Sequence, residues 1–170
     1  MFANVIDKDL VARVLSKARQ SPRLRANHCF HRPEERLQRM VNAALYGSYF
    51  APHRHDAENK REIFTILSGR AAVIEFSDQG EIEDKVLVEA GPGPWQVEIP
   101  PRTWHTLIVL SPEAVLYEVI DGHYDAATHK RFAPWAPPES DFAKGQAYLE
   151  SLITRCGFAP NKSSPSPPIP

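Results

Sequence analysis

The chain has 170 residues, of which 42% are hydrophobic, so a single domain with a substantial core is expected. Its 20 Lys and Arg residues nearly balance its 21 Asp and Glu residues, and the formal net charge of −1 argues against a surface devoted to nucleic acid or to a membrane. Cys29 and Cys156 are too far apart in sequence for a metal-type pair, and no apolar run approaches membrane-spanning length. We therefore predict a reduced, cytoplasmic protein without a signal peptide.

The first predicted element is an amphipathic helix over residues 8–20. Asp7 is a suitable N-cap residue, and apolar residues recur at helical spacing until Ser21-Pro22 interrupts the pattern. Residues 23–35 are basic and show no clear period, so we expect an ordered connection there. Residues 1–36 are thus predicted as an N-terminal helix with a basic connecting segment. The pattern of residues 37–45 fits either a helix or a strand.

Two histidines and a carboxylate follow in close succession. His53 and His55 are two residues apart, so on a strand both imidazoles point to the same side of the sheet. Glu62 opens a β-branched and aromatic run typical of a strand, and residues 56–61 are polar enough for the turn of a hairpin. A third histidine, His105, follows a Pro-containing turn before another apolar strand. Such a set suits Zn, Fe, Mn, Ni or Cu, whereas Ca and Mg prefer oxygen ligands; the alternative is a solvated His pair on a surface strand.

The spacing around these residues resembles the first motif of the cupin superfamily, in which a glycine, five residues, His-x-His, a short gap, Glu, six residues and a second glycine follow one another. Gly47 and Gly69 occupy the two glycine positions. The gap between His55 and Glu62 holds six residues instead of three or four, which leaves Glu58, inside the gap, as an alternative ligand.

The second cupin motif is matched more loosely. Arg102 stands where a glycine is usual and Val109 where an asparagine is common, but His105 is in place. The resemblance implies one divalent transition metal per chain (Fe, Mn, Zn or Ni), held by His53, His55, Glu62 and His105.

Four further segments are distinctive, namely residues 21–28 (SPRLRANH), 103–107 (TWHTL), 124–128 (YDAAT) and 132–137 (FAPWAP). Through them the chain more closely resembles the WbuC-type cupin family, over about residues 5–153. This resemblance implies a metalloprotein associated with surface polysaccharides, whose reaction is not established.

Short strands separated by Gly/Pro turns are expected at residues 62–67, 71–76, 82–88, 96–99, 104–110 and 114–120. Together with the motif they predict a mainly β fold, a single-domain cupin double-stranded β-helix (jelly-roll barrel) with an N-terminal and a C-terminal helix. The predicted parts are the barrel at 37–122, an aromatic and Pro-rich wrap with a closing helix at 123–156, and a disordered Pro/Ser tail at 157–170.

Strand alternation assigns the faces of these strands. If the four candidate ligands face inward, the residues that share their parity must face inward too, namely Phe64, Ile66, Leu107 and Val109. In the last strand, the face that carries Tyr117 is more apolar than the face that carries Glu118, and the pattern does not decide between them. Trp104 faces away from His105 and is expected in the core or in an interface.

A few further polar residues are candidates for ligand binding. Arg25, Asn27 and His28 precede the barrel and could lie over its mouth, although loop hydrogen bonding is the simpler explanation for Asn27 and His28. Arg23 and Arg25 have guanidinium groups that suit phosphate or carboxylate. We expect the remaining histidines, His31, His123 and His129, at the surface.

Two functions fit these observations. The protein is either a metal-dependent enzyme of the isomerase or dioxygenase type acting on a small polar molecule, such as a sugar or sugar nucleotide, or a metal-dependent protein that binds or senses a small ligand without turnover. Proton-transfer candidates are His28, Tyr117 and Glu118. A homodimer is also expected, because jelly-roll edge strands leave backbone groups unpaired.

Overall fold

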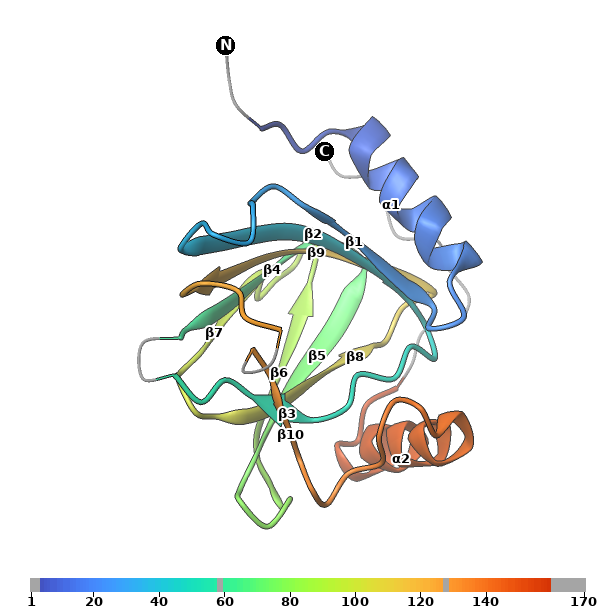
Figure 1. Cartoon of the computed structure of the whole chain (residues 1–170). Coiled ribbons are helices and arrows are strands. Elements are labelled where there is room, and N and C mark those ends of the chain that lie inside the picture. Colours follow the sequence, from blue (N-terminus) through green and yellow to red (C-terminus); the bar gives the residue numbers. More distant parts are fainter. Residues whose placement is uncertain (1–3, 58–59, 127–128, 160–170) are drawn as a thin grey trace.

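The protein is a two-sheet jelly roll flanked by two helices (Figure 1). The computed structural model describes residues 4–57, 60–126 and 129–159. One sheet has the strand order β1-β2-β9-β4-β7 and the other β10-β3-β8-β5-β6, with antiparallel pairing throughout. The elements are α1 (Lys8–Gln20), β1 (Arg25–Cys29), β2 (Leu37–Leu45), β3 (His53–Arg54), β4 (Glu62–Ser68), β5 (Arg70–Phe76), β6 (Ile82–Glu89), β7 (Gln96–Ile99), β8 (Trp104–Val109), β9 (Glu113–Asp121), β10 (Arg131–Phe132) and α2 (Phe142–Arg155).

Alternating side chains of the two sheets fill the barrel interior. Phe64 and Ile66 from one sheet meet Leu107 and Val109 from the other, and all four are buried in one cluster, as predicted. On β9, Leu116 belongs to this interior cluster. The inward face of the last strand is therefore the less apolar one, which carries Glu118. The mainly β jelly roll with two terminal helices, the cupin architecture, is confirmed.

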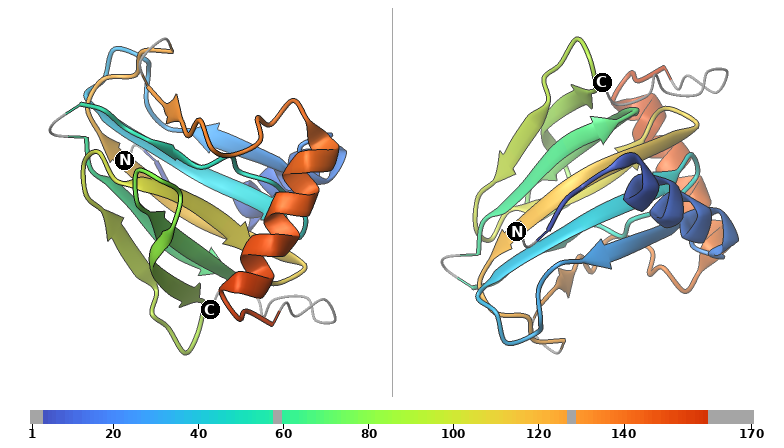
Figure 2. Two further views of the ribbon diagram at one scale, coloured as in Figure 1. Left: turned by 90° about the horizontal axis from the view of Figure 1, so that it is seen from below. Right: turned by 90° about the horizontal axis from the view of Figure 1, so that it is seen from above.

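Helix α1 covers the outer face of the first sheet (Figure 2). Its N-cap is Asp7, whose carboxylate accepts a hydrogen bond from the backbone N–H of Leu10 at 2.8 Å. The predicted helix over residues 8–20 is confirmed. Its apolar stripe packs against the outward side chains of β2 and β9; the buried residues here are Leu10, Val11, Val14, Leu15, Ala18, Val41, Ala43 and Val115.

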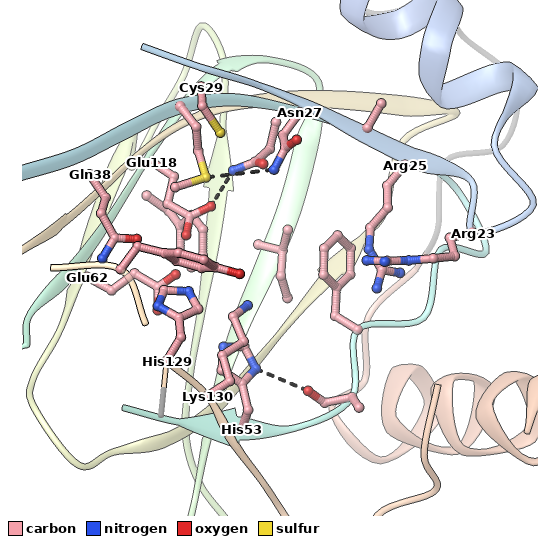
Figure 3. A pocket seen from close by; sticks show the side chains of 18 of the residues that line it. Arg23, Arg25, Asn27, Cys29, Gln38, His53, Glu62, Glu118, His129 and Lys130 are labelled. Atoms are coloured by element: carbon pink, nitrogen blue, oxygen red, sulfur yellow. Dashed lines mark hydrogen bonds between the residues drawn. The ribbon is translucent and has the colours of Figure 1, made fainter. Parts of the chain in front are cut away.

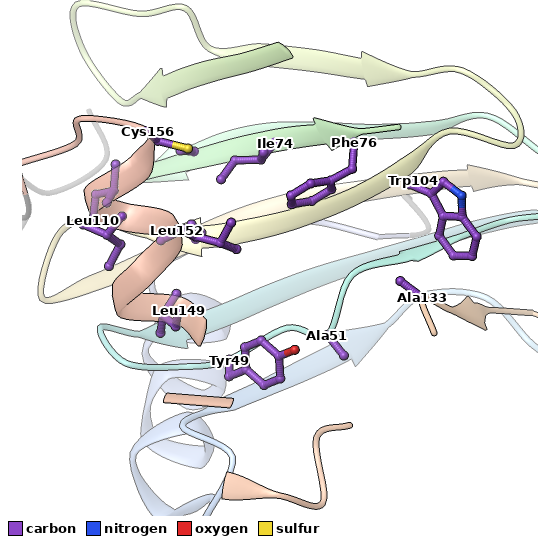
Figure 4. Packing of buried hydrophobic residues seen from close by; sticks show 13 residues of the cluster. Tyr49, Ala51, Ile74, Phe76, Trp104, Leu110, Ala133, Leu149, Leu152 and Cys156 are labelled. Carbon is purple, nitrogen blue, oxygen red and sulfur yellow. The ribbon is translucent and has the colours of Figure 1, made fainter. Parts of the chain in front are cut away.

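Helix α2 covers the outer face of the second sheet, where Leu149 and Leu152 pack near Ile74 (Figure 4). Trp104 belongs to this outer cluster, as expected from its parity, and its indole N–H donates to Asp78 at 2.8 Å. The ring of Trp135 from the wrap lies 6.3 Å from the ring of Trp104. Part of the wrap therefore packs over the outside of this sheet, as predicted.

Two local predictions are wrong. The predicted hairpin between His53 and Glu62 does not form, because β3 pairs in the second sheet and β4 in the first. The basic connection is not irregular throughout, because β1 pairs with β2 and extends the first sheet. The polar turn residues and the polar pattern of β1 are compatible with either arrangement, and only tertiary pairing decides. Of the predicted disordered tail, residues 160–170 lie outside the described residues.

In the part of the chain that the structure describes, every helix is too short or too polar to span a membrane. The cytoplasmic location stays a prediction.

The motif glycine Gly69 lies at a close approach of two chain segments. Its φ is +82°, and a Cβ at this position would lie 2.3 Å from the backbone oxygen of Glu113. Gly91 has a similar φ of +97°, but a Cβ there would have no other atom within 4 Å.

We predict that Gly69→Ala lowers the free energy of unfolding by about 1–3 kcal/mol more than Gly91→Ala does, because both replacements strain φ but only the first also creates a clash. Urea denaturation of both variants measures the difference. Equal losses would contradict the proposed close contact.

Candidate metal centre

The four residues of the first and second motifs converge inside the barrel. His53 and His105 are direct partners in the β3–β8 pair, and His55 follows β3, so three imidazoles come from the second sheet. Glu62, the first residue of β4, faces them from the first sheet. One ligand atom from each residue lies within 4.8 Å of the others, and all four side chains are buried.

Backbone carbonyls fix the orientation of each imidazole. The Nδ1 atoms of His53, His55 and His105 lie 3.1, 2.5 and 2.9 Å from the carbonyl oxygens of Ala51, His129 and Thr103 respectively. Because a carbonyl only accepts, each Nδ1 donates its proton there, and this contact turns each Nε2 toward the centre.

The Nε2 atoms of two rings meet the Glu62 carboxylate. Nε2 of His55 and Nε2 of His105 lie 3.0 and 2.9 Å from Glu62 Oε2. Among the described residues, His53 Nε2, His105 Nε2 and Glu62 Oε1 are buried and lack any hydrogen-bond partner. A cation at the centre would satisfy these buried polar atoms. The residues present therefore fit a metal ion with nitrogen and oxygen ligands.

Burial and neighbouring charges set the protonation of the site. Burial lowers the pKa of His53 well below its ordinary value, aided by the charge of Lys130. Burial would raise the pKa of Glu62, but His105 and hydrogen bonds hold it well below its ordinary range, which keeps Glu62 ionised. Burial and the adjacent Glu62 raise the pKa of Glu118 well above its usual value, so this second carboxyl is held in its neutral form.

A pocket of about 660 Å³ opens beside the four residues (Figure 3). Its walls come from the inner faces of β1, β2, β4, β8 and β9 and from Tyr124, His129, Lys130 and Phe132. The polar side chains around it include Arg25, Asn27, Gln38, Asn42, Glu118, His129 and Lys130.

Strand β1 brings two of the predicted binding residues to this pocket. Arg25 and Asn27 alternate along β1 and both line the cavity (Figure 3). The guanidinium of Arg25 pairs with Glu139 at 2.6 Å and donates to the carbonyl of Tyr49 at 2.6 Å, which fixes its position in the wall. Arg23 also lines the pocket, 3.7 Å from Glu139.

The positions of His28 and Tyr117 contradict the predictions made for them. His28 lies on the face of β1 opposite to Asn27, with its ring 5.0 Å from that of Phe30 in an edge contact. Phe30 in turn contacts Tyr117, and both pack against the cluster under α1. Neither His28 nor Tyr117 lines the pocket, because strand alternation turns them outward. We withdraw both as candidates for binding or proton transfer.

Glu118 is the predicted proton-transfer candidate that the fold does bring to the centre. It lines the pocket together with Glu62, and it accepts a short hydrogen bond from the side-chain amide of Asn42. Glu58, considered as an alternative ligand, lies outside the described residues.

His129, expected at the surface, is half-buried and lines the pocket. Its carbonyl accepts the Nδ1–H of His55, and its own Nδ1 lies 3.2 Å from the ammonium of Lys60. His31 also lines the rim, whereas His123 is exposed as predicted.

Gln38 and Lys130 were missed as pocket residues. The Gln38 side chain is fully buried; its Nε2 donates to the carbonyl of Gly122 at 2.6 Å, while its Oε1 has no partner among the described residues. No spacing signal in the sequence links these residues to the motif, because β2 and the wrap reach the site only through tertiary pairing.

Comparison with known families gives a partial match. One family model, described as a domain of unknown function (DUF6016), matches residues 6–88. This range includes His53, His55 and Glu62 but ends before His105. No curated protein matches the chain.

Solved structures share the fold. The capsular polysaccharide assembling protein CapF from Staphylococcus aureus is 23% identical, with a TM-score of 0.53, over 62% of this chain and 29% of its own. TT1209 from Thermus thermophilus is 23% identical, with a TM-score of 0.52, over 69% of this chain and 96% of its own. Protein SO0799 from Shewanella oneidensis is 11% identical, with a TM-score of 0.54, over 74% of this chain and 84% of its own. This chain therefore covers less than a third of CapF, and at these identities the three likenesses show a common fold alone.

Proposed function

We propose that the protein is a metal-dependent enzyme acting on a small polar molecule. The observation that carries the proposal is the contact of two imidazole Nε2 atoms, at 3.0 and 2.9 Å, with one oxygen of the Glu62 carboxylate in a fully buried site. His53, His55, Glu62 and His105 would hold one Fe, Mn, Zn or Ni ion. When bound, such a metal supplies Lewis acidity to a substrate oxygen or, in the case of iron, reactivity toward dioxygen.

The residues around the metal site support turnover more than passive binding. Glu118 is a carboxyl group that faces the pocket beside Glu62, and Asn42 orients it by a hydrogen bond. A carboxyl in this position can give a proton to, or take one from, a bound molecule. The 660 Å³ pocket is large enough for a molecule of sugar size, and its walls carry polar side chains that include Arg25, Asn27 and Gln38. The resemblance to WbuC-type cupins supports a substrate from surface-polysaccharide metabolism, with isomerisation or oxidation as the reaction.

Replacing either histidine of the pair, His53→Ala or His55→Ala, should abolish metal binding, because each removes one nitrogen ligand from a buried site. Metal analysis of untagged protein by mass spectrometry measures this, with the exposed His123→Ala as the matched control. Full metal content in either variant would contradict the assigned ligand set.

The fold should survive removal of the metal by a chelator, because the barrel core is apolar and continuous. Circular dichroism measures this, and unfolding on chelation would contradict the prediction.

Glu118→Gln should lower turnover by about 10²–10⁴-fold and leave metal content unchanged, since a proton-transfer group is lost but no ligand. Screens of dioxygen uptake and sugar-phosphate conversion on the metal-loaded wild type provide the activity, and the exposed Glu83→Gln is the control. Unchanged turnover in Glu118→Gln would remove its catalytic role. Ligand binding by the wild type without any conversion would favour the non-catalytic binding protein.

We also propose a homodimer. The edge strands β6 and β7 leave backbone groups without a strand partner on one side, and Trp95, in the connection between them, is 61% exposed. Light scattering at micromolar concentration should give twice the mass of one chain. A single-chain mass across this range would refute the dimer.

A further inference from the structure

Lys130 stands out among the cations that line the pocket. Its side chain extends into the cavity beside His53 (Figure 3). Within residues 4–57, 60–126 and 129–159 it forms no hydrogen bond or ion pair. The other cations near the cavity are engaged: Arg25 pairs with Glu139 at 2.6 Å, and Lys60 donates to the carbonyl of His123 at 3.1 Å.

The charge of Lys130 acts on the centre of the site. Lys130 lines the same pocket as His53, Glu62, His105 and Glu118. The ammonium therefore faces the same space as the candidate ligands, from the segment that precedes β10.

The charges around that space do not balance. A divalent metal and Lys130 would bring three positive charges, whereas Glu62 and Glu118 together supply at most two negative charges. A partly buried ammonium without a partner is costly, so the missing negative charge is expected from the ligand.

We propose that the pocket binds a small carboxylate, whose anionic group lies between the metal and Lys130. This inference rests on the proposed metal-dependent function. A carboxylate suits the site better than a phosphate does, because one ammonium is the unpaired donor here, whereas phosphate sites gather guanidinium forks or backbone N–H groups. Lys130 is then a substrate-binding residue that selects acids over neutral molecules of the same size.

The test compares two probes on metal-loaded protein by titration calorimetry. Oxalate is an anion that coordinates an open metal position, and imidazole is a neutral molecule that does the same. Lys130→Met should weaken oxalate binding by about tenfold or more, since one charge-assisted hydrogen bond is lost, and leave imidazole binding unchanged. Lys130→Arg should retain much of the oxalate affinity. Lys17→Met, which changes the net charge equally on an exposed face of α1, should affect neither probe.

The outcomes separate the two proposals. If the wild type holds no metal, the proposed function fails first, and metal analysis shows this before any titration. If metal is bound but oxalate does not bind, or Lys130→Met leaves its affinity unchanged, the carboxylate inference is overturned. Equal weakening of oxalate and imidazole, with normal metal content and thermal stability, would make Lys130 a structural residue and would overturn it as well.

Discussion

The burial of three imidazoles against one carboxylate is the constraint on which the rest of the structure depends. Each ring is held through Nδ1 by a backbone carbonyl, and the Nε2 atoms of His55 and His105 are thereby brought against Glu62. The arrangement needs both sheets, because the histidines come from one and the glutamate from the other. The apolar interior formed by residues such as Phe64 and Leu107 holds the two sheets at the distance that brings these groups together.

Much of this could be predicted from the sequence because its signals are local. The helical spacing of apolar residues predicted α1. Strand alternation predicted that Phe64, Ile66, Leu107 and Val109 face the barrel interior and that Trp104 faces outward. The candidate ligands were found in the same way, since His-x-His, Glu62 and His105 each stand at the start of a strand. Sheet membership was not predictable by these means. A polar linker between two strands looks the same whether they pair with each other or cross between sheets, as β3 and β4 do.

The pocket walls were less predictable than the metal site. On β9 the more apolar face lies under α1 and carries Tyr117, so a count of apolar residues predicts the wrong inward face for this strand. Glu118 lies on the inner face, where it is one of the polar groups that line the pocket. His28 points outward because it alternates along β1 with Asn27, which faces the pocket. The contributions of His129 and Lys130 depend on the wrap crossing the cavity, and the bond between His55 and His129 joins residues 74 positions apart in the chain.

The pairing of β2 has a consequence for how the protein acquires its structure during synthesis. β2 lies between β1 and β9, and Leu37 pairs with Asp121 while Leu45 pairs with Glu113. The first sheet therefore cannot close until the strand at residues 113–121 has left the ribosome, and β10 must follow before β3 has both neighbours. Pairing between such distant segments makes closure slow compared with helical proteins of similar size. The nascent chain thus displays His53, His55 and Glu62 before the barrel exists to shield them, and His105 joins them only when β8 has been made.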